Sequence, residues 1–307
     1  MRERFRGTEV REGVLFRGPA GWAEFSPFLD YDDVTCVPWL AAAREAAYGR
    51  WPAPVRTEIP VNCTVPALPA DRVAAVVRAS DGCTTAKVKV AETGQQPGDD
   101  LERVAAARDA LGAGGRVRVD ANGGWDVDTA VRMIGQLDAA AGGLEYVEQP
   151  CRTVEELAAV RRRVDVPIAA DESIRRADDP LRVAALQAAD VAVLKVQPIG
   201  GVAACLRVAE QIQLPVVVSS AIETSVGLAA GVALAAALPE LPYACGLGTV
   251  PLLTSDVVDH ALSPKRGVVP VSRPEPTVQR ITMCRPDAAI VRRWEERFAA
   301  VAAASAG

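Results

Sequence analysis

Six charged residues recur in the middle of this chain, each at or near the end of a short apolar run. They are Lys87, Lys89, Asp120, Glu148, Asp171 and Lys195. A strand that is buried between a barrel core and outer helices is expected to be apolar throughout. Charges that follow one another at the ends of successive strands therefore indicate a functional site rather than a solvated rim.

Three of these residues are acidic and predict a metal site. Asp120, Glu148 and Asp171 each close a different run. Converging carboxylates repel one another unless a cation neutralises them, and their oxygens suit a hard divalent ion. We therefore predict that these three residues bind Mg²⁺.

The three lysines predict acid–base chemistry beside that ion. Lys87 and Lys89 are two residues apart on one strand, so their side chains share a face, whereas Lys195 comes four strands later. Amines on opposite sides of a metal suit the removal of a proton next to a metal-bound carboxylate. The ion stabilises the enediolate that develops, and nearby cations lower the pKa of a lysine that acts as the base.

The elements that must position these residues form a strand–helix repeat. Short β-rich runs alternate with helix-period runs from about residue 56 to 248. We expect strands at 58–65, 85–90, 117–120, 145–148, 167–171, 191–195, 216–219 and 243–247. Eight strands fit an α/β fold of the modified TIM-barrel type, (β/α)7β, in which the carboxyl ends of the strands meet at one face. The competing architecture, an open doubly wound sheet, usually carries a G-x-G-x-x-G motif that is absent here.

The two ends of the chain do not continue this repeat. We assign residues 1–52 to a small α+β capping domain, residues 53–262 to the barrel and residues 263–307 to a segment that packs with the cap. The tail is expected to end in a helix at 288–304.

Composition excludes several classes of protein. With 50% hydrophobic and 24% charged residues and a net charge of -5, the chain is globular rather than disordered. The acidic balance and the lack of a basic stripe argue against a nucleic-acid partner. The apolar run 226–238 is too short to span a membrane, for which about 20 residues are needed, so we predict a buried helix there. The first residues lack the apolar segment of a secretory signal, and we expect a cytoplasmic protein.

The cysteines and the single histidine exclude further chemistry. Seven scattered cysteines, with no C-x-x-C pair, are typical of reduced, buried thiols. His260 is the only histidine and lies far from any nucleophile motif, so we expect a structural or surface role for it. Zinc hydrolases that need two or three histidine ligands are thereby excluded.

The motifs around the charged residues resemble those of a known family. The motifs are Lys87-Val-Lys89, Arg118-Val-Asp120-Ala-Asn122, Glu148-Gln-Pro150, Asp171-Glu-Ser173 and Lys195. Together they resemble the enolase superfamily in its muconate-lactonizing subgroup, which uses lysines on the second and sixth strands as acid–base groups. The mandelate-racemase subgroup needs a His–Asp pair, which a chain with one histidine outside the seventh strand lacks.

Within the subgroup, four stretches are similar to the short, actinobacterial type of o-succinylbenzoate synthase. These stretches are 18–28, 60–67, 219–231 and 246–249. The resemblance implies a Mg²⁺-dependent syn elimination of water from 2-succinyl-6-hydroxy-2,4-cyclohexadiene-1-carboxylate, which gives o-succinylbenzoate for menaquinone synthesis. The implied partner is thus a small-molecule substrate.

The resemblance also implies roles for individual residues. Lys89 would abstract the proton α to the carboxylate and then protonate the departing hydroxyl. Lys195 would hold the intermediate from the other face through a cation–π contact, and Lys87 would support Lys89. Arg118 and Asn122 would support the metal ligands from behind. The implied substrate-binding residues are Ser219, Ser220, Gly246, Gly248 and Thr249.

Other activities stay open at the level of sequence. Some relatives racemise N-succinylamino acids with the same two lysines, and the motifs do not separate the two reactions. A Schiff-base aldolase would use Lys195 but would leave three carboxylates unexplained. A non-catalytic barrel would be expected to have lost part of the acid–base set. Dipeptide epimerases carry Asp-x-Asp after the eighth strand, where this chain has Gly246-Leu-Gly248.

Overall fold

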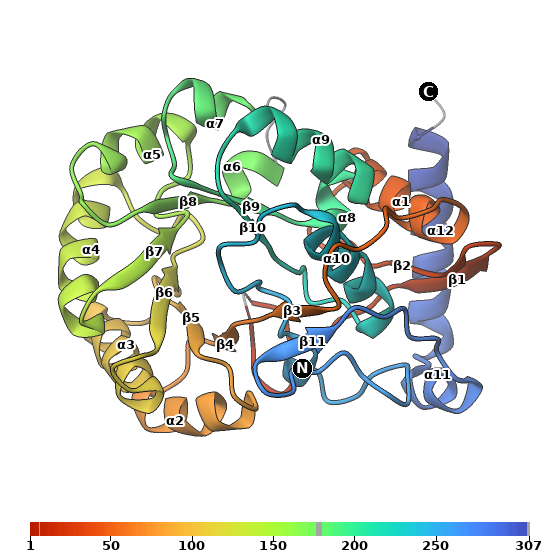
Figure 1. The fold of residues 1–307 in the computed structure, drawn as a ribbon. Helices are drawn as coiled ribbons and strands as arrows, with labels where there is room; N and C mark the ends of the chain where they lie inside the picture. The colour runs from red at the N-terminus through yellow and green to blue at the C-terminus, as the bar shows by residue number, and fades with distance from the viewer. Residues whose placement is uncertain (6, 176–179, 306–307) are drawn as a thin grey trace.

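A curled sheet of parallel strands forms the larger part of the molecule (Figure 1). The computed structural model describes residues 1–5, 7–175 and 180–305. The sheet strands are β4 (Cys63–Val65), β5 (Thr85–Lys89), β6 (Arg116–Asp120), β7 (Leu144–Glu148), β8 (Ile168–Ala170), β9 (Val191–Leu194) and β10 (Val216–Val218). They lie side by side in chain order, from β4 to β10. Every neighbouring pair is parallel, as expected when a helix connects each strand to the next.

An eighth segment closes the gap between the first and last strands of the sheet. Cys245 makes a parallel bridge to Val61, just before β4, and Gly246 makes one to Ser219, just after β10. The Gly246 amide donates to the Val218 carbonyl at 2.8 Å, and the Ser220 amide donates back to Gly246 at 3.0 Å. The segment expected as a strand at 243–247 therefore pairs through single bridges, and the prediction of a modified TIM barrel is confirmed.

The first predicted strand, 58–65, is divided in two. Its first part is β3 (Glu58–Pro60), which pairs antiparallel with β11 (Val268–Pro270) outside the barrel. Only β4 joins the parallel sheet. The expectation of one continuous strand was wrong because β3 has a partner from the C-terminal segment, about 200 residues away, which periodicity does not reveal.

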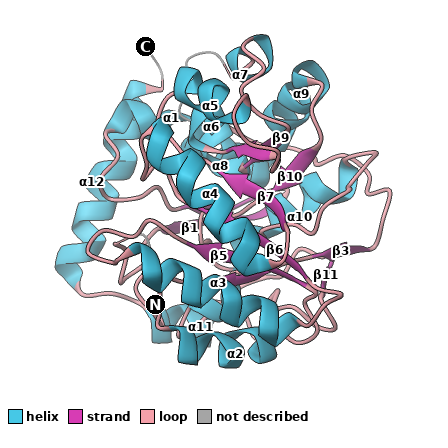
Figure 2. Ribbon diagram, turned by 90° about the vertical axis from the view of Figure 1, so that its left-hand side faces the viewer, coloured by secondary structure: helices cyan, strands magenta, loops and turns pink. Residues whose placement is uncertain are grey.

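Helices surround the outer face of the sheet, as Figure 2 shows from the side. They are α2 (Ala70–Ala79), α3 (Pro97–Leu111), α4 (Val127–Ala141), α5 (Val154–Arg161), α7 (Arg182–Ala185), α9 (Val202–Ile212) and α10 (Ser225–Ala237). The short helices α6 (Glu172–Arg175) and α8 (Val196–Ile199) instead begin at the carboxyl ends of β8 and β9, and a 3₁₀ turn lies at Val250–Leu252. Asp126 caps α4 through the Thr129 amide, and Thr153 forms a capping box with Glu156 at α5. The apolar run at 226–238 is the buried helix α10, as predicted. None of the helices among the described residues has the length and apolar character required to cross a membrane.

A smaller layer, which we call the cap, packs beside the sheet. It contains the hairpin of β1 (Val14–Gly18) and β2 (Gly21–Phe25), the helix α1 (Asp33–Tyr48) and the C-terminal helix α12 (Ala288–Ala304), with α11 (Val278–Cys284) nearby (Figure 1). The rings of Phe25, Trp294 and Phe298 meet edge to face in its core. The first and last parts of the chain thus fold together, and the boundaries at residues 52 and 262 remain a proposal.

The inside of the barrel contains a small apolar cluster below the charged residues. This cluster consists of Tyr146, Ala169, Val191, Val193 and Val217, with Tyr243 against it. Six of the seven cysteines are buried and Cys284 is exposed. Burial raises the pKa of the six buried thiols, to about 12 for Cys63 and Cys245, which disfavours the reactive thiolate. His260 is exposed, in agreement with the surface role expected for it.

Candidate active site

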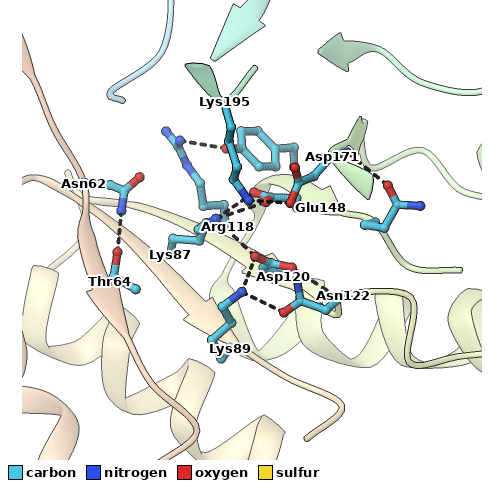
Figure 3. Close-up of polar contacts among 12 residues, drawn as sticks. Asn62, Thr64, Lys87, Lys89, Arg118, Asp120, Asn122, Glu148, Asp171 and Lys195 are labelled. Atoms are coloured by element: carbon cyan, nitrogen blue, oxygen red, sulfur yellow. Dashed lines mark hydrogen bonds and ion pairs between the residues drawn. The ribbon is translucent and has the colours of Figure 1, made fainter. Parts of the chain in front are cut away.

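The register of the sheet brings the predicted charged residues together at the carboxyl ends of the strands (Figure 3). Lys89 on β5 lies opposite Asp120 on β6, and Asp120 lies opposite Glu148 on β7. Asp171 and Lys195 each come one residue after a strand, at the ends of β8 and β9. Because side chains alternate along a strand, these residues all project into the barrel.

Lys87 joins two of the three acidic residues. Its Nζ atom lies 3.1 Å from Oδ2 of Asp120 and 3.0 Å from both carboxylate oxygens of Glu148. All three side chains are buried. The ammonium group thereby neutralises carboxylates that burial would otherwise make unfavourable.

Asp120, Glu148 and Asp171 form what we call the acidic cluster, and the other two lysines lie on different sides of it. Lys89 Nζ donates to Oδ2 of Asp120 at 2.5 Å and to Oδ1 of Asn122 at 2.7 Å. Lys195 Nζ donates to Oδ2 of Asp171 at 2.6 Å. Figure 3 shows Lys89 approaching from one side and Lys195 from the other.

These contacts and burial shift the pKa values of the three carboxyl groups in different directions. Burial alone would raise the pKa of Asp120, but the ammonium groups of Lys89 and Lys87 outweigh it and hold the pKa well below its ordinary value. For Asp171, Arg175 and Lys195 outweigh burial in the same way and lower the pKa. Burial and the neighbouring charge of Asp120 instead raise the pKa of Glu148 to about 7.

The donor chemistry of the three acidic residues fits a divalent cation. Glu148 is flanked by the charges of Asp120 and Asp171, both of which oppose its ionisation. An added positive charge would relieve that repulsion. Among the described residues, no group of three acidic, histidine or cysteine side chains is arranged to share one ion, and Lys87 and Lys195 form ion pairs with the carboxylates. In this structure the ammonium groups of Lys87, Lys89 and Lys195 neutralise the three carboxylates.

A cavity opens above the cluster, and its volume is only about 30 Å³. Its lining includes seven of the residues predicted from sequence: Lys87, Lys89, Lys195, Ser219, Ser220, Gly246 and Thr249. The hydroxyl groups of Ser220 and Thr249 are hydrogen-bonded to each other at 2.8 Å. A cavity of this size holds about one water molecule, so the lining side chains lie close together in this structure.

Two of the predicted residues lie elsewhere. Gly248 packs against backbone, since a Cβ there would be 2.6 Å from the Asn62 carbonyl oxygen, and it does not line the cavity. Arg118 projects into the lower part of the barrel, where it donates to the Tyr146 hydroxyl at 2.8 Å and forms an ion pair with Glu145. Neither residue contacts the acidic cluster. Asn122 does contact it, because its backbone amide donates to the Asp120 carboxylate and its side chain accepts from Lys89.

Several residues of the site were missed by sequence reasoning. Arg175 lines the cavity, and its Nε atom lies 2.9 Å from Oδ1 of Asp171. The two residues are four positions apart, a spacing that brings side chains together on a helical turn and that could have identified Arg175 from sequence. Gln149 holds the end of β8 by accepting from the amides of Asp171 and Ser173. The ring of Phe5 lies over the Lys89 ammonium, 4.9 Å from it, and no pattern in the first residues predicts this contact.

Both the barrel and the N-terminal part of the chain match known protein families. Residues 70–276 match the family described as Enolase C-terminal domain-like, and residues 1–47 match the Enolase N-terminal domain-like family. An o-succinylbenzoate synthase of Thermobifida fusca is 64% identical over 99% of this chain and 94% of its own length. Proteins of the same name from Mycolicibacterium smegmatis and Mycobacterium leprae are 58% and 53% identical, over 84% and 97% of this chain and 79% and 87% of their own lengths.

Solved structures show the same fold at lower identity. An L-Ala-D/L-Glu epimerase from Bacillus subtilis matches with a TM-score of 0.72 at 23% identity, over 86% of this chain and 89% of its own. A muconate lactonizing enzyme from Pseudomonas fluorescens matches with a TM-score of 0.69 at 26% identity, over 76% and 66%. Since relatives more than half identical along nearly the whole chain share one name, the chain belongs to the o-succinylbenzoate synthase family of the enolase superfamily, an enzyme family of the hydro-lyase class.

Proposed function

We propose that this enzyme removes water from 2-succinyl-6-hydroxy-2,4-cyclohexadiene-1-carboxylate to give o-succinylbenzoate, and that the reaction serves menaquinone synthesis. One observation carries the proposal: a relative named o-succinylbenzoate synthase is 64% identical over 99% of the chain. The arrangement of two lysines on different sides of a buried acidic cluster supports it, because the proposed elimination needs a base near the α-carbon and positive charge around the substrate.

In the proposed reaction, Lys89 acts as base and then as acid. Its neutral amine takes the proton from the carbon next to the carboxylate. The electron pair of that C–H bond forms a ring double bond as the C–O bond to the hydroxyl group breaks. The ammonium group of Lys89 then gives the proton to the departing hydroxyl, which leaves as water, so the elimination is balanced without a further reactant.

The remaining residues hold the substrate and its charge. Lys195 lies on the other side of the site and would face the ring as it becomes aromatic. Lys87 keeps Asp120 and Glu148 in place through its bridging contacts. Ser219, Ser220, Gly246 and Thr249 line the cavity where the succinyl end would lie.

We propose that a divalent cation, Mg²⁺, is bound by the three acidic residues. Its ligands would be Asp120, Glu148 and Asp171, whose oxygen donors suit such an ion. When bound, the cation supplies positive charge that stabilises the negative charge developing on the substrate carboxylate.

The test is a comparison of two reactions in the purified protein and its Lys89→Ala variant. With Mg²⁺ present, we expect the wild type to form o-succinylbenzoate, and we expect turnover in Lys89→Ala to fall by about 10³-fold or more, since it loses its acid–base group. Binding of o-succinylbenzoate, measured by calorimetry, should remain. Near-normal turnover in the variant would contradict the role of Lys89. Racemisation of N-succinylamino acids without any synthase activity would replace the proposed reaction by the racemase.

A further inference from the structure

Two glutamates of the cap reach across to helices of the barrel. Glu45 on α1 accepts from the amides of Val202 and Ala203, at 2.6 and 2.9 Å, at the start of α9. Glu24 on β2 does the same at the start of α10, where it accepts from the amides of Thr224 and Gly227, both at 3.1 Å. Each carboxylate satisfies amides that have no partner inside the helix.

Glu24 is the more deeply enclosed of the two. Its side chain is buried and also accepts hydrogen bonds from the hydroxyl groups of Thr224 and Ser26, at 2.5 and 2.7 Å. Thr224 is the N-cap residue of α10. The contact between Glu24 and Thr224 therefore joins the cap to the last residue before that helix.

The segment before α10 forms one wall of the cavity. Residues Ser219, Ser220, Ala221 and Ile222 all line it. The segment is held at both ends, since Ser219 is bridged to Gly246 and Thr224 is bonded to Glu24. Its conformation therefore determines the shape of the space next to the acidic cluster.

This wall contains a strained residue. Ile222 has a φ of +63°, a left-handed conformation that is an outlier for a β-branched side chain. Such strain persists only where the surroundings fix it. Here the Arg11 guanidinium donates to the Ile222 carbonyl at 3.2 Å, and two residues later Glu24 holds Thr224. Both contacts come from the N-terminal part of the chain, outside the barrel.

We propose that Glu24 is a positioning residue: it holds Thr224 and the first turn of α10, and so keeps Ile222 and the neighbouring cavity wall in the conformation that receives the substrate. Glu24 itself does not line the cavity, and it acts through the 219–224 segment. The activity part of this proposal rests on the proposed synthase function, whereas the structural part does not.

The experiment compares Glu24→Gln with Glu45→Gln. Both variants keep the size of the side chain and remove the charge from one contact between the cap and a barrel helix, but Glu45 faces α9 rather than the cavity wall. Hydrogen exchange read by mass spectrometry should show faster exchange in 219–227 for Glu24→Gln only. With o-succinylbenzoate as the probe, its Kd should rise at least about tenfold in Glu24→Gln, and kcat/KM should fall by a similar factor. Glu45→Gln should change both values less than about twofold.

Equal effects of the two variants would overturn the proposal, because Glu24 would then only stabilise the cap. Unchanged exchange in 219–227 for Glu24→Gln would overturn it as well. If Glu24→Gln does not fold, Ser26→Ala removes a hydroxyl bond to Glu24 without changing α10, and it should give the same exchange pattern with a smaller effect. If the wild type lacks synthase activity, the proposed function fails, while the exchange comparison still decides the role of Glu24.

Discussion

The carboxyl group of Glu223 differs from those of the acidic cluster in having no lysine partner among its described contacts. It is buried, and it accepts a hydrogen bond from the Ala221 amide at 2.8 Å. Burial, followed by the charge of the nearby Glu24, raises the pKa of Glu223 to about 7, although the Arg11 guanidinium acts in the opposite direction. The folded protein therefore binds a proton here more tightly than the unfolded chain does.

This raised pKa predicts a pH dependence of stability. The folded-state pKa of about 7 lies above the ordinary value of 4.5, so the stabilising contribution is complete below pH 4.5 and is lost as the pH rises to 7. Glu223→Gln cannot ionise, so its stability relative to wild type should improve by on the order of 2–3 kcal/mol between pH 5 and pH 8. Urea unfolding at several pH values measures this. Glu210→Gln, at an exposed position, serves as the control. A stability difference between Glu223→Gln and wild type that does not change with pH would contradict the prediction.

At this scale, the sequence predicted the charged residues of the site but not their partners. Lys87, Lys89 and Asp120 could be placed because strand periodicity and the position of strand ends determine where such residues point. Phe5 could not be placed, because its contact with Lys89 joins an irregular segment to a strand more than 80 residues away. Gly248 was expected at the cavity because it lies in a motif, whereas its neighbour is the backbone of Asn62.

At the scale of elements, α10 depends on a glycine where it meets the cap. A Cβ on Gly227 would lie 2.8 and 2.9 Å from side-chain carbons of Glu223 and 2.9 Å from Cδ of Glu24. These distances are too short for real contacts, so a larger residue must displace one of the two carboxyl groups. The two glutamates can pack against the first turn of α10 only because no side chain lies between them.

Two alanine substitutions test this packing. Alanine favours helix over glycine by about 0.5–1 kcal/mol, but at Gly227 we expect overpacking to outweigh this and to lower stability by about 1–2 kcal/mol net. Gly135 in α4 is exposed, and a Cβ there meets nothing within 4 Å. Gly135→Ala should therefore raise stability by about 0.5–1 kcal/mol. Denaturant unfolding of both variants gives the values, and a stabilised Gly227→Ala protein would show that the first turn of α10 has room to spare.

The elements themselves were largely predictable from sequence. Helices such as α4 and α5 follow from apolar spacing together with the capping residues Asp126 and Thr153. The break between β3 and β4 was not predictable, because β3 pairs with β11, which comes about 200 residues later in the chain. Local pattern determines an element, whereas long-range pairing determines where it is divided.

At the scale of the whole molecule, binding of the proposed cation should stabilise the fold. A ligand that binds only the folded state stabilises it by about 2.7 kcal/mol at 100 times its Kd. We therefore expect the Tm of the wild type to rise by several degrees with saturating Mg²⁺, and EDTA to reverse the shift and abolish activity. Asp171→Asn should weaken the apparent Mg²⁺ affinity by at least about tenfold, because it removes one anionic ligand.

Thermal unfolding across a Mg²⁺ titration measures both effects. Asp190→Asn is the matched control, since Asp190 pairs with Arg161 at 2.7 Å away from the acidic cluster. Its own Tm is expected to fall slightly, while its Mg²⁺-induced shift should equal that of the wild type. An identical titration for Asp171→Asn and wild type would remove Asp171 from the proposed metal site.

The distribution of the thiols has a practical consequence for labelling. Six cysteines are enclosed and only Cys284 faces solvent, so a maleimide dye attached to the native chain would report from a single position. Cys284 lies 3.9 Å from the Asp256 carbonyl oxygen, and the Asp256 carboxylate bonds to Ser225 in the first turn of α10. A dye on the native Cys284 would therefore sit next to Asp256, which contacts the first turn of α10, the helix that follows the cavity wall. No engineered cysteine is needed for this label.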